Sequence, residues 1–184
     1  MKTYFFEQCR NNQTIGRFFA SLLALAPTFF IMKKLAILGV GFSLKNFDWE
    51  SDYEVWGLNH HKDKFKRFDL WFDLHKTELV DGIITQANFP FEQVYKLRRI
   101  PVEGRTVVKH RYFASSMSYM AAYAVLKGYE EILFAGCDFD CGDEKRTKQR
   151  ECLEQWIAFA QGRGIKIKVI AGSPLAMETG LYIR

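Results

Sequence analysis

Short apolar segments alternate with helix-like segments along this chain, and this alternation constrains the fold more than any other feature. Six segments read as strands, at residues 35–40, 53–58, 67–75, 105–109, 131–136 and 165–170. Residues 35–40 form a continuous apolar run, typical of a strand buried on both faces of a parallel sheet. Residues 115–128 and the charged residues 144–162 each predict a helix, and residues 76–100 predict one or two more. The pattern predicts an α/β fold with a mainly parallel sheet of about five to six strands, followed by a loop-like tail at 171–184.

Composition narrows the class of protein. The chain has 184 residues, which suits one domain with a sizeable core. An apolar fraction of 48% and a charged fraction of 26% exclude a disordered chain, a fibrous repeat and a multi-span membrane protein. Four cysteines are too few for a disulfide scaffold and indicate reduced thiols, so a cytoplasmic location is expected.

The first 31 residues differ from the rest. Residues 17–31 are apolar after a basic start, as in a signal peptide, but they are too short for a comfortable membrane span. Met32 opens a lysine pair and an apolar strand, which is how many nucleotide-binding domains begin. We expect residues 1–31 to be an extension and residues 32–184 to be a single domain. Membrane contact by residues 17–31, or a helix docked on the domain, are less favoured alternatives.

The charge of the chain suits an anionic partner. The formal net charge is +5 and the pI is about 9.0, a mild basic excess. Basic residues cluster at 62–67, 98–111 and 145–150, but acidic residues are interspersed among them. This mixture indicates solvated faces rather than a nucleic-acid groove, so a nucleotide is the expected partner and nucleic acid is unlikely.

A glycine motif follows the first predicted strand. Gly39 and Gly41 would let the backbone approach a phosphate, and Ser43 could cap the next helix or bind an anion. In open α/β sheets, ligands bind at the carboxyl ends of the strands, which is where this motif falls. A tight strand-to-helix turn explains the same glycines equally well.

Further polar residues stand at predicted strand ends or at a helix start: Asn59, His75, Asp138, Asp140, Ser115 and Ser116. In a parallel sheet these positions share one edge, so we expect the side chains to converge there. Each could instead be a turn or capping residue. Asp138 and Asp140 are spaced so that both could hold Mg²⁺ together with a nucleotide. A zinc site is not predicted, because the cysteine spacing is wrong and the adjacent His60 and His61 would point to opposite faces of an extended segment.

These motifs resemble a Rossmann-like group of bacterial and phage proteins. The group contains bacterial sialyltransferases that use CMP-sialic acid, motility-accessory-factor glycosyltransferase-like proteins and the hydroxymethylpterin pyrophosphokinase. The resemblance rests on GVGFSL at 39–44, VWGLNH at 55–60, SSMSYMAAYAVLKGYEEILFAGCDFD at 115–140 and Ser-Pro-Leu at 173–175. It implies a Rossmann-like three-layer fold and a nucleotide or nucleotide-sugar ligand, with contacts at Gly41, Ser43, Asn59, Ser115, Ser116 and Asp138.

The chain departs from the sialyltransferases in two places. Their helical lid carries a histidine proposed as general base, whereas no histidine follows His110 here. Phe42 also replaces the proline that often follows the second glycine.

The expected function is that of a glycosyltransferase-like transferase. His75 is the expected general base, because an imidazole titrates near neutrality, and Asp138 or Asp140 is the alternative. Two other functions remain open: a non-catalytic protein that sequesters a nucleotide, and a pyrophosphokinase-like phosphotransferase.

Overall fold

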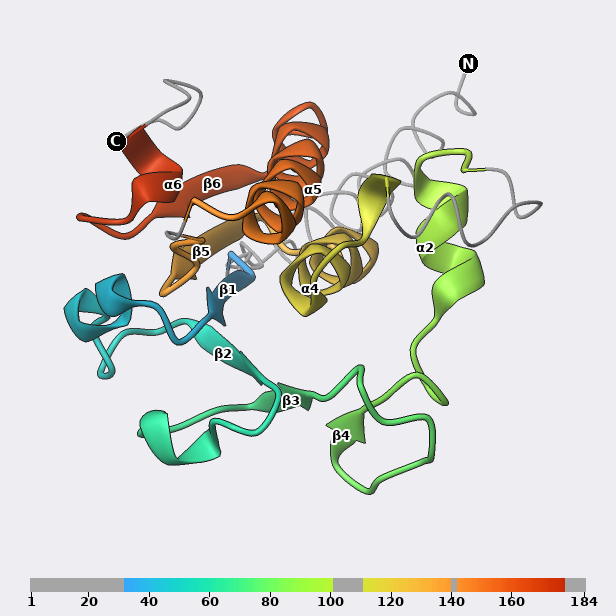
Figure 1. Ribbon diagram of the computed structural model, residues 1–184, viewed down its shortest axis with the longest axis horizontal. Helices are drawn as coiled ribbons and strands as arrows, with labels where there is room; N and C mark the ends of the chain where they lie inside the picture. Colours follow the sequence, from blue (N-terminus) through green and yellow to red (C-terminus); the bar gives the residue numbers. More distant parts are fainter. Residues whose placement is uncertain (1–31, 101–110, 140–141, 178–184) are drawn as a thin grey trace, which may run out of the picture. The chain divides into compact units, whose positions relative to one another are not determined.

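A parallel sheet forms the centre of the fold (Figure 1). The computed structural model describes residues 32–100, 111–139 and 142–177. Within them, six strands are ordered β4-β3-β2-β1-β5-β6 and every neighbouring pair is parallel. The strands are β1 (Lys34–Leu38), β2 (Glu54–Leu58), β3 (Leu70–Phe72), β4 (Ile83–Ile84), β5 (Glu131–Ala135) and β6 (Lys166–Val169). The predicted α/β class and the Rossmann-like parallel sheet are confirmed.

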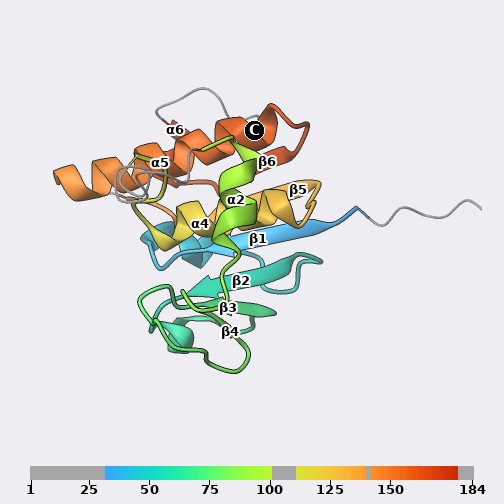
Figure 2. The same ribbon diagram turned by 90° about the vertical axis from the view of Figure 1, so that its right-hand side faces the viewer.

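Three α-helices pack against one face of the sheet: α2 (Phe91–Leu97), α4 (Ser116–Leu126) and α5 (Glu144–Gln161). The chain crosses from the edge strand β4 through α2 and α4 to β5, on the other side of β1. The core on this face joins Ile37 and Phe134 of the central strands to Met120 of α4 and Trp156 of α5, all fully buried. The first turns of α4 and α5 lie at the same side of the domain as the arrowhead of β2 (Figure 2).

The opposite face has a thinner cover. Its core contains small side chains such as Ala36 and Ala135, covered by Phe47 and Phe65 from the connecting segments. Two short 3₁₀-helices, η1 (Phe42–Asn46) and η2 (Lys62–Lys64), follow β1 and β2. The third layer is therefore built from these short helices and loops.

Five local predictions need correction or fall outside the described residues. β3 is shorter than the predicted strand at 67–75 at both ends. Before it, the Asp69 carboxylate accepts the Val55 N–H at 2.7 Å in place of a backbone carbonyl, and after it the chain turns at residues 74–75. The two isoleucines of β4 pair with β3 in a segment predicted to be helical, and α6 (Pro174–Met177) lies in the predicted loop tail. The strand predicted at 105–109 lies outside the described residues, as does the extension at 1–31. None of the described helices is both long and apolar enough to cross a membrane.

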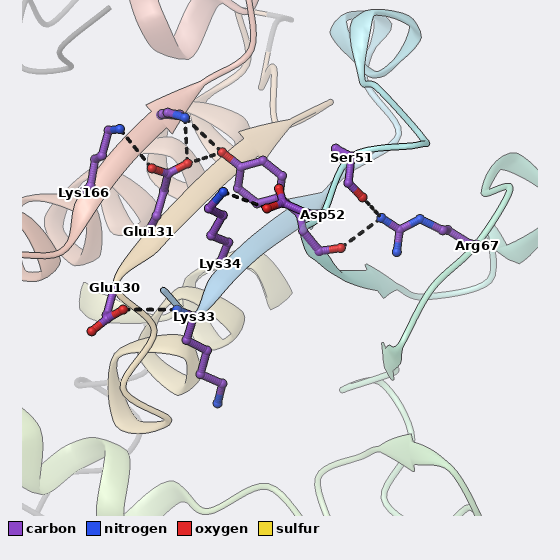
Figure 3. Close-up of polar contacts among 10 residues, drawn as sticks. Lys33, Lys34, Ser51, Asp52, Arg67, Glu130, Glu131 and Lys166 are labelled. Atoms are coloured by element: carbon purple, nitrogen blue, oxygen red, sulfur yellow. Dashed lines mark hydrogen bonds and ion pairs between the residues drawn. The ribbon is translucent and has the colours of Figure 1, made fainter. Parts of the chain in front are cut away.

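A charged cluster joins the amino-terminal ends of the strands (Figure 3). Glu131, at the start of β5, is 2% exposed and pairs with Lys168 at 2.7 Å and with Lys166 at 3.0 Å. Tyr53 donates a hydrogen bond to the same carboxylate. Burial acts to raise the pKa of Glu131, but the hydrogen bonds from Lys168, Tyr53 and Lys166 lower it to about 2. This cluster fastens β5 and β6 to the segment before β2, at the end of the sheet opposite the pocket described next.

Candidate functional site

A pocket of about 580 Å³ opens at the carboxyl ends of the strands. The chain leaves β1 toward β2 on one face of the sheet and enters β5 from the other face, so the connections diverge around β1. Such a switch in strand order is where open α/β sheets bind ligands. The pocket is lined by several predicted residues: Gly41, Asn59, His75, Ser115, Ser116 and Asp138. The predicted convergence of these positions is therefore present in the fold, while Gly39 and Ser43 lie behind the pocket wall.

Ser43 and Asp138 interlock the segments that follow β1 and β5. The Ser43 hydroxyl donates to Asp138 Oδ1 at 2.5 Å, and the Ser43 N–H donates to Asp138 Oδ2 at 2.8 Å. The same hydroxyl accepts the Gly136 N–H at 2.9 Å. Ser43 is fully buried and Asp138 is 4% exposed, so this contact acts as a brace between two loops. Ligand contacts by either residue stay a prediction.

The two glycines of the motif are required by space. A Cβ on Gly39 would lie 2.2 Å from the Gly136 carbonyl oxygen, and a Cβ on Gly41 would lie 2.4 Å from Asp138 Oδ2. Gly41 has φ −68°, so a left-handed conformation is not the reason for glycine there. The Gly39 and Gly41 N–H groups donate to Ala135 and Gly136 carbonyls, each at 2.8 Å. These two amides hold the loops together and are not free to bind a phosphate.

Asn59 presents its side chain from a constrained backbone. Its φ is 60°, in the left-handed region that asparagine tolerates better than most residues. Its N–H donates to the Phe72 carbonyl at 2.7 Å, and its carbonyl accepts from the Trp71 indole at 2.7 Å. The fixed backbone leaves the amide side chain at the pocket wall, where its Oδ1 is 3.5 Å from the Ser116 hydroxyl.

The start of α4 forms another part of the wall. Ser115 is the N-cap, and its hydroxyl accepts the Ser118 N–H at 3.4 Å, as the sequence predicted for a capping serine. The first amides of a helix have no partner within the helix, and its dipole makes this end positive. Ser116 and Met117 place these amides beside the pocket, where they favour an anion.

Arg146 and Gln149 extend the wall from the first turns of α5, and the sequence did not predict either. Arg146 is exposed. Its backbone N–H donates to Asp143 Oδ1 of the N-cap at 2.7 Å, and its guanidinium Nε lies 3.9 Å from Asp143 Oδ2. The basic cluster at 145–150 was interpreted as a solvated face. The sequence shows which charged residues lie on the same face of α5, but only the packing of α5 in the fold shows which face lines the pocket.

Two histidines line the pocket from the ends of β2 and β3. His75 is exposed and lies in the turn after β3, whereas His61 is half-buried at the start of η2. The rings of His60 and His61 are 4.1 Å apart. Opposite faces were predicted for this pair on the assumption of an extended backbone, and the turn into η2 removes that assumption.

The magnesium site has little support from these residues. Both Asp138 oxygens already accept hydrogen bonds from Ser43, which leaves few lone pairs for a cation. Asp140, the other half of the predicted pair and an alternative catalytic residue, lies outside the described residues. The part of the chain that is described contains no group of three or more histidine, cysteine or acidic side chains arranged to hold a metal ion.

Several solved structures with a similar fold are sialyltransferases. CstII from Campylobacter jejuni in complex with cytidine-5'-monophosphate is 21% identical, with a TM-score of 0.54, over 83% of this chain and 86% of that chain. The monofunctional α-2,3-sialyltransferase Cst-I from Campylobacter jejuni is 19% identical, with a TM-score of 0.53, over 83% of this chain and 81% of that chain. A CST-II complex with a trisaccharide acceptor and CMP gives 18% identity, with a TM-score of 0.52, over 78% of this chain and 84% of that chain. No protein-family model and no curated protein sequence matches the chain. The similarity establishes that this chain has the fold of these enzymes.

Proposed function

We propose that this protein is a glycosyltransferase-like transferase that binds a nucleotide or nucleotide sugar in the pocket at the switch point. The observation that carries the proposal is the convergence of the first turn of α4, Arg146 and the Asn59 amide on one pocket. A helix start and a guanidinium suit a phosphate, and an amide suits the polar edge of a base or sugar. The fold shared with sialyltransferases, among them complexes with CMP, supports the same ligand class.

The phosphate is expected at α4, and not at the glycine motif. The N–H groups of Gly39, Gly41 and Ser43 already donate hydrogen bonds to β5 and the segment that follows it. The first amides of α4 and the Arg146 guanidinium remain as the donors of strongest positive character on the pocket wall. In a transfer reaction these groups would stabilise the charge that develops on the leaving phosphate.

Arg146 offers the sharpest test of binding. The 184-residue chain would be titrated calorimetrically with CMP, UMP, AMP and GMP, and then with CMP-sialic acid. Arg146→Ala is expected to weaken binding by about 10-fold or more, the effect of losing a charge-assisted hydrogen bond. Lys145→Ala is the matched control, because it removes the same charge from the neighbouring position of α5, which does not line the pocket. Equal losses in both variants would reduce the role of Arg146 to general electrostatic attraction and would count against the proposed site.

Asn59→Gly tests the amide separately. Glycine adopts the left-handed conformation easily, so the backbone bonds to β3 should persist while the side chain is lost. We expect unchanged thermal stability and weaker nucleotide binding. An unchanged affinity would remove Asn59 from the site.

A second function, nucleotide binding without transfer, is favoured by one feature. Residues 136–143 connect β5 to α5, and this connection is short for a segment that closes over a ligand during a transfer reaction. Tight nucleotide binding with no turnover of any nucleotide sugar would support this second function. Turnover of ATP instead would support the phosphotransferase alternative.

A further inference from the structure

The pocket has two chemically different halves. The half above β1 and β5 contains the helix start of α4, Asp138 and Arg146. The other half, above β2 and β3, contains His61, His75 and Gln86. In the sheet, β2 and β3 lie on one side of β1, whereas β5 lies on its other side. The two halves of the pocket therefore occupy different stretches of the sheet edge. Asn59 and Ser116 stand where the halves meet, 3.5 Å apart.

On the basis of the proposed function, we propose that the histidine half receives the acceptor hydroxyl, and that His61 is the general base that activates it. The anionic leaving group then occupies the half above β1 and β5, where the positive groups are. His61 and His75 follow the paired residues Leu58 and Phe72 at the same spacing, which places both histidines on the same rim. Acceptors would therefore enter over the ends of β2 and β3.

Three observations select His61. It is half-buried and lines the pocket, whereas the adjacent His60 is exposed and does not line it. The His61 ring packs against the His60 ring, with centroids 4.1 Å apart and planes at 43°. Among the described residues, no hydrogen bond uses a His61 ring nitrogen, so both nitrogens are available to a substrate. A half-buried ring that packs on a neighbouring ring has fewer orientations than an exposed one, and a well-oriented base is more effective, which favours His61 over the exposed His75.

In the proposed step, one bond forms as another breaks. The acceptor oxygen forms a bond to the anomeric carbon of the donor sugar, and its proton passes to the His61 imidazole. The bond between that carbon and the phosphate oxygen of the nucleotide breaks, and its electron pair stays on the phosphate. His61 then releases the proton to solvent. Water can replace the acceptor, in which case the donor is hydrolysed.

The test compares three variants of the 184-residue chain: His61→Gln, His75→Gln and His60→Phe. The last keeps a ring against His61 but removes the imidazole, and so serves as the matched control. Nucleotide affinity is measured by calorimetry and donor hydrolysis by release of CMP from CMP-sialic acid, with other nucleotide sugars run in parallel. His61→Gln should lower kcat about 100-fold or more, His75→Gln should lower it by less than His61→Gln does, and His60→Phe should lower it less than about 10-fold. The nucleotide Kd of all three variants should stay within about threefold of the parent, because the histidines lie in the other half of the pocket.

Failure of the proposed function and failure of the role of His61 give different results in these assays. If the parent chain binds no nucleotide, the proposed function fails and this inference fails with it. If the parent binds nucleotide but hydrolyses no donor, nucleotide binding stands and the role of His61 is overturned. If the parent hydrolyses donor and His61→Gln does so equally well, or if His75→Gln causes the larger loss, His61 is not the base although the transferase stands. Melting curves of each variant separate lost activity from lost folding.

Discussion

The brace between Ser43 and Asp138 makes a strong prediction about stability. Ser43→Ala removes the hydroxyl that donates to Asp138 at 2.5 Å and accepts from the Gly136 N–H at 2.9 Å. A hydrogen bond to a charged group contributes about 1.5–3 kcal/mol, and a buried N–H left without a partner costs about 1–3 kcal/mol. Gly136 and Ser43 are both buried, so water cannot readily replace the lost partner. Because the two effects share one atom, we expect a combined loss of about 3 kcal/mol rather than the sum of the extremes.

Unfolding in urea, followed by circular dichroism, measures this loss directly. For a domain of this size, a loss of about 3 kcal/mol lowers Tm by roughly 6–12 °C. Ser51→Ala is the matched control, because its hydroxyl makes one hydrogen bond in an exposed loop, to the Asp48 carbonyl at 2.6 Å. The control should lose less than about 1 kcal/mol. A double-mutant cycle with Asp138→Ala should return a coupling energy of about 1–3 kcal/mol.

The same variant discriminates between the brace and a direct ligand contact. If Ser43 binds a nucleotide directly, as the sequence motif predicted, Ser43→Ala should weaken binding and leave unfolding almost unchanged. If Ser43 acts through the brace, unfolding should change most. A stability loss no larger than that of Ser51→Ala would refute the reasoning from buried contacts.

Three further predictions concern other residues. Gly41→Ala should destabilise the domain by about 1–3 kcal/mol in urea unfolding, because its Cβ would lie 2.4 Å from a carboxylate oxygen of the braced Asp138; an unchanged midpoint would contradict this. Burial acts to raise the pKa of Glu131, but the hydrogen bonds from Lys168 and its neighbours lower it to about 2, below its ordinary value of 4.5. The contribution of Glu131 to the free energy of unfolding is therefore complete above pH 4.5 and is lost as the pH falls toward 2. Glu131→Gln should flatten the urea midpoint over that pH range, and an equally steep profile in the variant would place the acid sensitivity elsewhere. Burial raises the pKa of the Cys137 thiol to about 12, so iodoacetamide at pH 8 should leave Cys137 unmodified in the folded chain and modify it in urea, as mass spectrometry of the peptides would show.

The sheet could be predicted because its central strands are buried on both faces. Every residue of β5 is buried, and after Glu131 the strand is a continuous apolar run from Ile132 to Ala135. The edge strand β4 could not be predicted, because two isoleucines that pair with β3 give no periodic signal. The start of β3 depends on a hydrogen bond from the Val55 N–H to the Asp69 carboxylate, which a pattern of apolar residues does not reveal.

The site was predictable to the extent that strand ends define it. Asn59 and His75 were predicted to converge with Asp138 because the carboxyl ends of parallel strands meet at one edge, and all three line the pocket. Arg146 was not predicted, because α5 carries many charges and its rotation about its own axis is set by contacts with α4 and the sheet. The one available signal was its place in the first turn of a helix that follows a strand end.

The glycine motif shows why a phosphate loop and a tight turn could not be distinguished from the sequence. Both require residues without a Cβ, but they use the backbone amides differently. Here the Gly41 N–H donates to the Gly136 carbonyl, and the Ser43 N–H donates to the Asp138 carboxylate. An N–H that donates within a buried brace cannot also donate a full hydrogen bond to a phosphate. The glycines therefore bring two loops together, and the proposed function places the anion instead at the first turn of α4 beside Arg146, which the motif does not contain.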